Sequence, residues 1–228
     1  MIARKKEFYV GVGMLAAFVV VLIIIFSPVF NGQNGLEYLD SLYNSISKGS
    51  AYYIPEVKEQ TDMFKGKSIS VTLAMTDKAQ SQQTAPLFKA GGANVTVKGA
   101  ELKATGDLGK ILENCLADSD AMYKNKGQKV FKKYGYDERQ ALFNWWKAAK
   151  AMDKDLKKQK LFKEAKVVAL MVKKAVESSY NYYKIESQKI GDRLGIVIFS
   201  LLFYIVYTLW YGFAVMFMFE GWGMKLEY

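Results

Sequence analysis

Residues 194–219 read LGIVIFSLLFYIVYTLWYGFAVMFMF, and none of these twenty-six side chains is charged. A helix of this length extends about 39 Å at about 1.5 Å per residue, whereas the hydrocarbon core of a bilayer is about 30 Å thick. The stretch therefore predicts a transmembrane helix that tilts or extends a turn beyond the bilayer.

A second apolar stretch lies near the start of the chain, at residues 9–30. Its run from Val10 to Phe26 is longer than the apolar core of a cleaved signal peptide, which has about 7–15 residues, and the Ser-Pro-Val-Phe that follows is a poor cleavage site. We therefore predict a transmembrane helix that acts as an uncleaved signal anchor. Basic residues at 4–6 favour a cytoplasmic N-terminus, although Lys184, Lys189 and Arg193 before the second span favour the reverse.

Between the spans, the spacing of apolar residues changes along the chain. Leu36, Leu39, Leu42 and Ile46 are spaced as on an amphipathic helix that ends near Gly49. Further along, the patterns predict a strand at 69–75, a polar helix at 77–90 interrupted by Pro86, two strands turning at Lys98-Gly99, and a helix at 108–124. This order is typical of a small α+β module with an antiparallel sheet.

Two longer helices follow from Asp137 onward. Leu142, Trp145 and Leu156 share one face of the first helix, which predicts that Trp145 belongs to the domain core. A short Lys-rich connection leads to a second helix from Leu161, so we expect an antiparallel helix pair. This second helix could continue into the second span with a break at Gly191.

The predicted fold is a membrane protein in which two transmembrane α-helices flank a small α+β module followed by a long antiparallel helix pair. Its segments are a cytoplasmic tail at 1–8, transmembrane helix 1 at 9–30, a membrane-proximal helical segment at 31–65, the α+β module at 66–127, the helix pair at 128–192, transmembrane helix 2 at 193–219 and a cytoplasmic tail at 220–228.

The composition is poor in catalytic and metal-binding side chains. The chain has no histidine and one cysteine, Cys115, so it lacks the commonest general base and cannot form a structural zinc site or a thiolate-held iron–sulfur cluster by itself. Cys115 lies on the apolar side of its helix and is expected to be a small buried side chain. Asp118 and Asp120 lack the pattern of a calcium loop. We therefore expect no enzyme activity, no cofactor and no metal.

The region between the spans is strongly basic. Residues 31–193 hold 28 of the 32 basic and 19 of the 22 acidic side chains, a net charge of +9. Nearly all of the basic residues are lysines, which solvate a helix surface well and also tolerate anionic lipid headgroups, but lack the planar fork with which arginine binds phosphate. With no nucleic-acid-binding motif present, we do not expect nucleic acid as a partner.

Tyrosines occur in the middle of the second span, where a wet hydroxyl is unexpected. At 100° per residue, Ser200, Tyr204, Tyr207 and Tyr211 share one side of the helix, which we call the tyrosine face. A hydroxyl without a partner is costly in hydrocarbon, so this face should contact protein. The first span offers Gly13 and Ala17, a small-xxx-small pair that lets another helix approach closely.

These features predict a non-catalytic accessory or scaffolding subunit of a larger integral-membrane complex. Its extracytoplasmic Lys-rich domain would dock on partner subunits or anionic headgroups, in an oligomeric assembly at the bacterial inner membrane. Two alternatives are an extracytoplasmic ligand-sensing module without its own output domain, and a homo-oligomeric pore lined by the tyrosine face. The absence of charged residues within the spans weakens the pore hypothesis.

Overall fold

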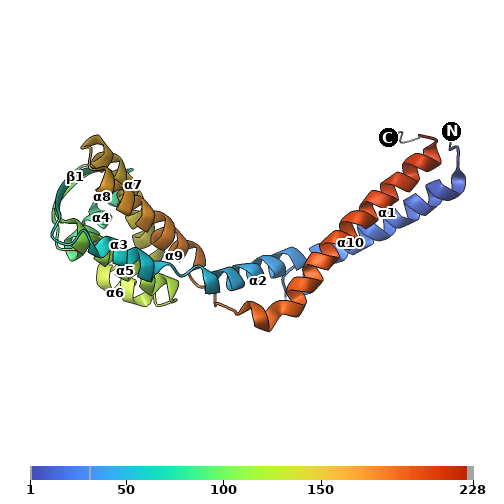
Figure 1. Ribbon diagram of the computed structural model, residues 1–228, viewed down its shortest axis with the longest axis horizontal. Coiled ribbons are helices and arrows are strands. Elements are labelled where there is room, and N and C mark those ends of the chain that lie inside the picture. Colours follow the sequence, from blue (N-terminus) through green and yellow to red (C-terminus); the bar gives the residue numbers. More distant parts are fainter. Residues whose placement is uncertain (1, 31, 225–228) are drawn as a thin grey trace. The chain divides into compact units, whose positions relative to one another are not determined.

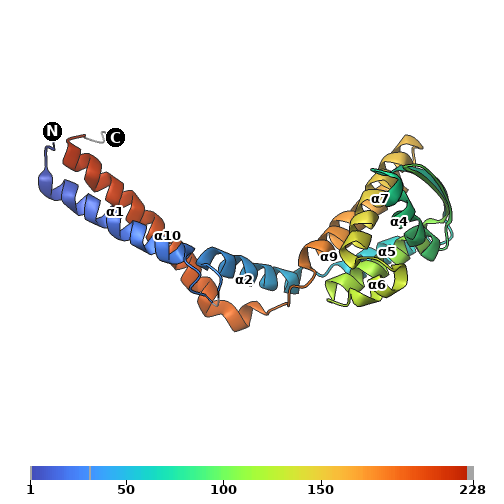
Figure 2. The same ribbon diagram turned by 180° about the vertical axis from the view of Figure 1, so that it is seen from behind.

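The computed structural model describes residues 2–30 and 32–224, which divide into two units (Figures 1 and 2). The terminal unit takes its residues from 1–49 and 187–228, and the central unit comprises residues 50–186. The described chain is mostly helical, with one three-stranded sheet and an apolar helix near each end. The predicted combination of two apolar terminal helices with a small sheet and further helices between them is confirmed.

The sheet of the central unit is antiparallel throughout, with strand order β1-β3-β2. Its strands are β1 (Ser68–Ala74), β2 (Asn94–Lys98) and β3 (Glu101–Asp107). Along β1, Ile69, Val71 and Leu73 are buried while the residues between them are exposed, so one face of the sheet packs on the core. Between β2 and β3 the chain turns at Gly99, whose φ of +60° suits a residue without Cβ.

The central unit also contains the helices α3 (Ile54–Asp62), α4 (Lys78–Ala90), α5 (Leu108–Tyr123), α6 (Gln128–Tyr134), α7 (Glu138–Lys158), α8 (Phe162–Met171) and α9 (Glu177–Tyr182), with a π-helical turn at Val172–Val176. Of these, α4, α5 and α7 make the main contacts with the sheet. The core between helices and sheet contains Phe88, Leu102, Ile111 and Trp145, all fully buried. Helix α3, which lies within the predicted segment 31–65, packs on α5 inside the central unit.

Aspartate begins three of these helices. The side chains of Asp77, Asp107 and Asp137 accept hydrogen bonds from the backbone N–H groups of Gln80, Lys110 and Gln140, three residues further on. Each bond satisfies a donor that the first helical turn leaves unpaired, and the negative charge suits the positive end of the helix dipole. The starts of α4, α5 and α7 are therefore set locally by the sequence.

The prediction that Pro86 interrupts the helix at 77–90 is wrong, because α4 runs through this residue to Ala90. Proline removes one intrahelical hydrogen bond and crowds the preceding turn. The residues directly after it, Leu87 and Phe88, are fully buried. Packing of these two side chains in the core compensates for the local cost and keeps the last turn helical.

The second long helix does not continue into the C-terminal apolar helix. It ends at Tyr182, Lys184 has a φ of +67°, and helix α10 (Ile190–Trp222) starts later, with Gly191 inside its first turn. Asn125 holds the segment after α9: its Oδ1 accepts the Lys184 N–H at 2.8 Å and its Nδ2 donates to the Ile185 carbonyl at 3.0 Å. These contacts give the non-helical backbone partners that a continuous helix would otherwise supply.

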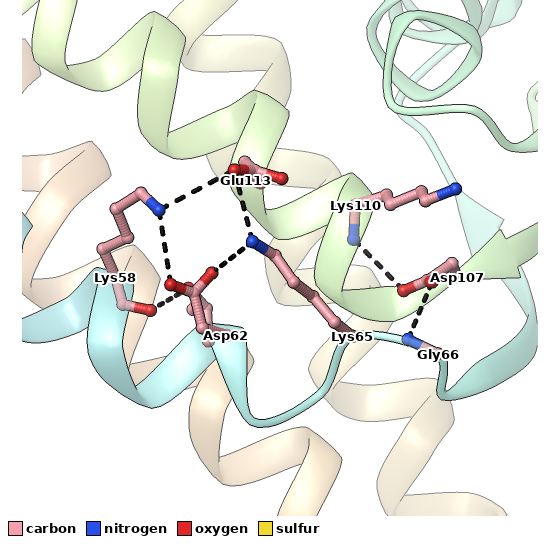
Figure 3. A network of polar contacts seen from close by, with 8 residues as sticks. Lys58, Asp62, Lys65, Gly66, Asp107, Lys110 and Glu113 are labelled. Carbon is pink, nitrogen blue, oxygen red and sulfur yellow. Dashed lines mark hydrogen bonds and ion pairs between the residues drawn. The ribbon is translucent and has the colours of Figure 1, made fainter.

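A network of polar contacts fastens α3 and the loop after it to α5 (Figure 3). Lys65 Nζ lies 2.8 Å from the Asp62 carboxylate and 3.4 Å from that of Glu113. Such exposed ion pairs are screened by water and contribute little to stability. The tighter constraint is backbone packing, because a Cβ on Gly109 would lie 2.6 Å from the backbone nitrogen of Lys65.

In the terminal unit, helix α2 (Gly35–Ser50) follows α1 (Lys5–Phe26). Its first turn is closed by a reciprocal pair of hydrogen bonds: Glu37 N–H donates to Asn34 Oδ1 at 2.9 Å, and Asn34 N–H donates to Glu37 Oε2 at 3.1 Å. This capping box explains why the helix begins at the Asn-Gly-Leu-Glu sequence.

Candidate functional site

Helices α1 and α10 are both long and apolar enough to cross a membrane, judged by length and composition. Very little of either helix is buried within the chain, which distinguishes them from the core helices of a soluble domain. They lie side by side over much of their length (Figure 1). Phe8, near the start of α1, contacts Trp222 at the end of α10, and Phe18, further along α1, contacts Tyr207 earlier in α10. The two helices are therefore antiparallel.

The contact between the two helices combines close backbone approach at two glycines with packing of aromatic rings. A Cβ on Gly11 would lie 2.8 Å from the Ala214 carbonyl oxygen, and one on Gly221 would lie 2.5 Å from Phe8 Cβ. Glycine at these positions lets the backbones approach closely. Further along, the rings of Phe18 and Tyr207 stack with their centroids 4.2 Å apart.

The structure divides the residues of the tyrosine face. Tyr207 is stacked on Phe18, and its enclosed hydroxyl has no hydrogen-bond partner in the described part of the chain. The Ser200 hydroxyl lies 2.7 Å from that of Tyr43 on α2, and the two form a hydrogen bond. Tyr204 and Tyr211 remain 68% and 50% exposed. Tyr207 and one side of Tyr211, whose ring centroid lies 5.3 Å from that of Phe18, therefore serve the helix pair, while Tyr204 and the rest of Tyr211 present their surface outward.

Gly13 and Ala17 do not form the α1–α10 contact. A Cβ on Gly13 would meet no atom within 4 Å, and Ala17 is exposed. The contact instead uses Gly11 and Phe18, which meet Ala214 and Tyr207 of α10. Met14, Val21 and Ile25 are also partly buried and continue the same alternate spacing of three and four residues. The small-xxx-small pattern identified a smooth face of α1, but that face is directed away from α10.

In the central unit, a pocket of about 320 Å³ lies between α7 and the π-helical turn with α9. We call it the aromatic pocket, and its lining consists of Phe143, Trp146, Val176, Glu177, Tyr180 and Asn181. Such π-helical turns are rare and frequently occur at functional sites. The sequence analysis missed this pocket, although Phe143 and Trp146 are three residues apart and lie beside the buried Leu142–Trp145 face of the same helix.

Cationic side chains lie over the aromatic rings of the pocket. The Lys150 ammonium is 3.8 Å from the Trp146 ring centroid, and that of Lys147 is 5.5 Å away. Arg139 lies over Tyr180, 5.3 Å from its ring centroid. The carboxylate of Glu177 accepts the Trp146 indole N–H at 2.8 Å and lies 3.7 Å from Lys150 Nζ.

Trp145, the predicted core residue, is fully buried beside Phe88. Its indole N–H donates to Asp118 Oδ2 at 2.9 Å, and the same carboxylate accepts from Tyr134 Oη at 2.5 Å and Lys133 Nζ at 2.7 Å. Burial, reinforced by the Asp118 charge, raises the pKa of Tyr134 well above its ordinary value. This buried network joins α5, α6 and α7, so its hydrogen bonds assign Asp118 a structural role.

The remaining chemistry-bearing groups are also engaged in structure. Asp120 accepts a hydrogen bond from Tyr52 and forms an ion pair with Lys124. Burial raises the pKa of the Cys115 thiol, which disfavours the reactive thiolate. Within residues 2–30 and 32–224, no three histidine, cysteine, aspartate or glutamate side chains are grouped as a metal site would require.

Comparison with protein families, with curated proteins and with solved structures gives no match for this chain. Two surfaces lined by aromatic side chains are therefore the candidate functional sites: the outer side of the α1–α10 pair and the aromatic pocket.

Proposed function

We propose that the chain is an integral-membrane, non-catalytic accessory or scaffolding subunit of a larger membrane assembly. In this proposal α1 and α10 are transmembrane helices, α1 acts as the signal anchor, and the basic central unit lies outside the cytoplasm, at the bacterial inner membrane. The subunit would contribute binding surfaces and no metal or cofactor of its own.

The observation that carries the proposal is the exposure of Tyr204 and Tyr211 after α1 and α10 have paired. Within the bilayer a phenol hydroxyl without a partner is costly, since lipid tails offer no hydrogen bonds. Additional helices from partner subunits would cover these rings and supply acceptors. Gly13 and Ala17, exposed on α1, provide a second smooth surface on which a partner helix can pack closely.

Replacement of Tyr204 and Tyr211 by leucine tests this role. The double variant stays apolar enough to insert, but loses both hydroxyls and the shape of the outer face. Because membrane hydrogen bonds average about 0.6 kcal/mol each, both positions are changed together. We expect the variant to reach the membrane and to migrate as a smaller species than the wild type in native gels from mild detergent.

Valine at Leu202, Ile205 and Leu209 is the matched control, because these exposed side chains are purely aliphatic. This control variant should keep the wild-type native size. A photo-reactive phenylalanine analogue at position 204 should also cross-link to another membrane protein. Unchanged native size in the double variant, together with no cross-link from position 204, would refute the proposed role.

A further inference from the structure

The aromatic pocket has the dimensions and surface of a binding site. Its volume of about 320 Å³ lies at the lower end of the range for ligand pockets, about 300–1,000 Å³. Phe143, Trp146, Val176 and Tyr180 supply apolar walls, while Asn181 and Glu177 add polar groups. Tyr180 and Asn181 are exposed, so the pocket opens to solvent and can admit a side chain of another protein.

The charges around the pocket select against a cationic occupant. Aromatic rings beside a carboxylate often bind ammonium groups. Here, however, Lys147 and Lys150 already lie over the Trp146 ring, and Arg139 lies over that of Tyr180. Glu177 is engaged by the Trp146 indole and Lys150. Three cations therefore face one carboxylate among the lining residues, and the local charge is positive.

This combination of an apolar cavity and a cationic rim points to a partner of complementary chemistry. We propose that the aromatic pocket binds an acidic segment of a partner protein, with an aromatic side chain of that segment inserted between Phe143, Trp146 and Tyr180. The acidic residues on either side of that ring pair with Lys147, Lys150 and Arg139. This inference rests on the proposed function, since it defines the partner chemistry that the central unit of a docking subunit recognises.

The geometry favours a protein segment over anionic lipid headgroups. A headgroup layer offers many negative charges but no protruding ring to fill an apolar cavity, whereas aromatic side chains are the usual anchors at protein interfaces. The cations are also held close to aromatic faces, with Lys150 Nζ 3.8 Å from the Trp146 centroid. They are thus positioned around the cavity and not spread over a flat basic surface.

Peptide binding to the full chain in detergent tests the proposal. The probes are fluorescein-labelled DEDWEDE, the same peptide with alanine in place of tryptophan (DEDAEDE), and the basic KRKWKRK. We expect fluorescence anisotropy to show binding of DEDWEDE, binding of DEDAEDE that is weaker by about tenfold, and no binding of KRKWKRK. Tighter binding of KRKWKRK, or equal binding of the two acidic peptides, would overturn the proposal.

Two variants locate the binding site. Lys147→Glu with Lys150→Glu should weaken DEDWEDE binding by about tenfold or more, since it reverses two charges of the rim. Phe143→Ala should weaken it without changing any charge. The matched control, Lys98→Glu with Lys103→Glu, makes the same charge change on exposed positions of the sheet and should bind within about twofold of the wild type.

Circular dichroism and thermal unfolding of each variant verify that the central unit remains folded. Competition then separates the two sources of negative charge. If phosphatidylserine vesicles displace DEDWEDE and bind with the same dependence on Lys147 and Lys150, the surface is a headgroup site and the inference is wrong. If the wild-type chain does not bind DEDWEDE, but the Tyr204 and Tyr211 replacements still reduce its native size, this inference alone is refuted and the proposed function stands.

Discussion

Trp145 shows how one residue combines apolar packing with a polar anchor. Its ring lies 5.3 Å from that of Phe88, and its indole N–H is bonded to the buried Asp118 carboxylate. A buried charge is tolerated only when donors surround it, and Asp118 has three of them. The apolar and the polar part of the core therefore depend on the same side chain.

Replacing Trp145 by alanine should lower the free energy of unfolding of the central unit by about 3–5 kcal/mol, since it leaves a large cavity and removes one donor from Asp118. Denaturant unfolding followed by circular dichroism measures the change. Trp145→Phe keeps most of the packing and should cost less. If the alanine variant unfolds at the wild-type denaturant concentration, Trp145 does not contribute to the core as described.

The carboxylate of Asp107 caps the start of helix α5. Burial alone would raise its pKa, but the backbone N–H groups of Gly66, Lys110 and Gly109 together hold the pKa below the ordinary value of 3.8. A carboxylate with a lowered pKa in the folded state stabilises the fold above its unfolded pKa. This stabilisation disappears as the pH falls through the folded pKa, below about pH 4.

The Asp107→Asn variant should therefore unfold more easily than the wild type at neutral pH, and the difference should shrink as the pH falls through the lowered folded-state pKa of Asp107. Thermal unfolding as a function of pH gives this comparison. Serine is another good N-cap residue without a charge. If the charge is the cause, the difference in stability between the wild type and Asp107→Ser should shrink at acid pH in the same way. A difference that stays constant from neutral to acid pH would contradict the assignment.

At the scale of elements, patterns that depend on near neighbours predicted the structure well. Alternation of Ile69, Val71 and Leu73 identified β1, because successive side chains of a strand point to opposite faces. Long uninterrupted apolar runs predicted α1 and α10. The short helix α6 went unpredicted, since its seven residues contain too few apolar positions to establish a helical period.

Features that depend on how two elements meet were not predictable. Both Gly11 and Gly13 could let a helix approach closely, and only the packing of α10 selects Gly11. The three tyrosines share one side of α10, yet Phe18 of α1 contacts Tyr207 and leaves Tyr204 exposed. Helix α1 therefore covers only part of the tyrosine face. The aromatic pocket likewise forms between α7 and α9, which are distant in sequence.

At the scale of the whole molecule, the proposed orientation follows from the basic residues at the start of α1. The native Cys115 is fully buried, so an added cysteine supplies the accessible thiol. We expect a membrane-impermeant maleimide to label Lys98→Cys in intact cells and to label Ala3→Cys only after the membrane is opened. The reverse labelling pattern would mean that the central unit is cytoplasmic.

The two connections to the central unit leave the terminal unit next to each other. The Gln188 N–H donates to the Ser45 carbonyl at 3.0 Å, close to the points where the chain departs at Gly49 and returns at Ser187. Residues 50–186 are thus an insertion whose two ends share one attachment point, a geometry in which domains are exchanged with little strain. A short Gly-Ser linker could join Gly49 to Ser187 and leave a minimal hairpin of α1, α2 and α10. The helices of the terminal unit and the inserted central unit are thus separable modules that can be exchanged independently.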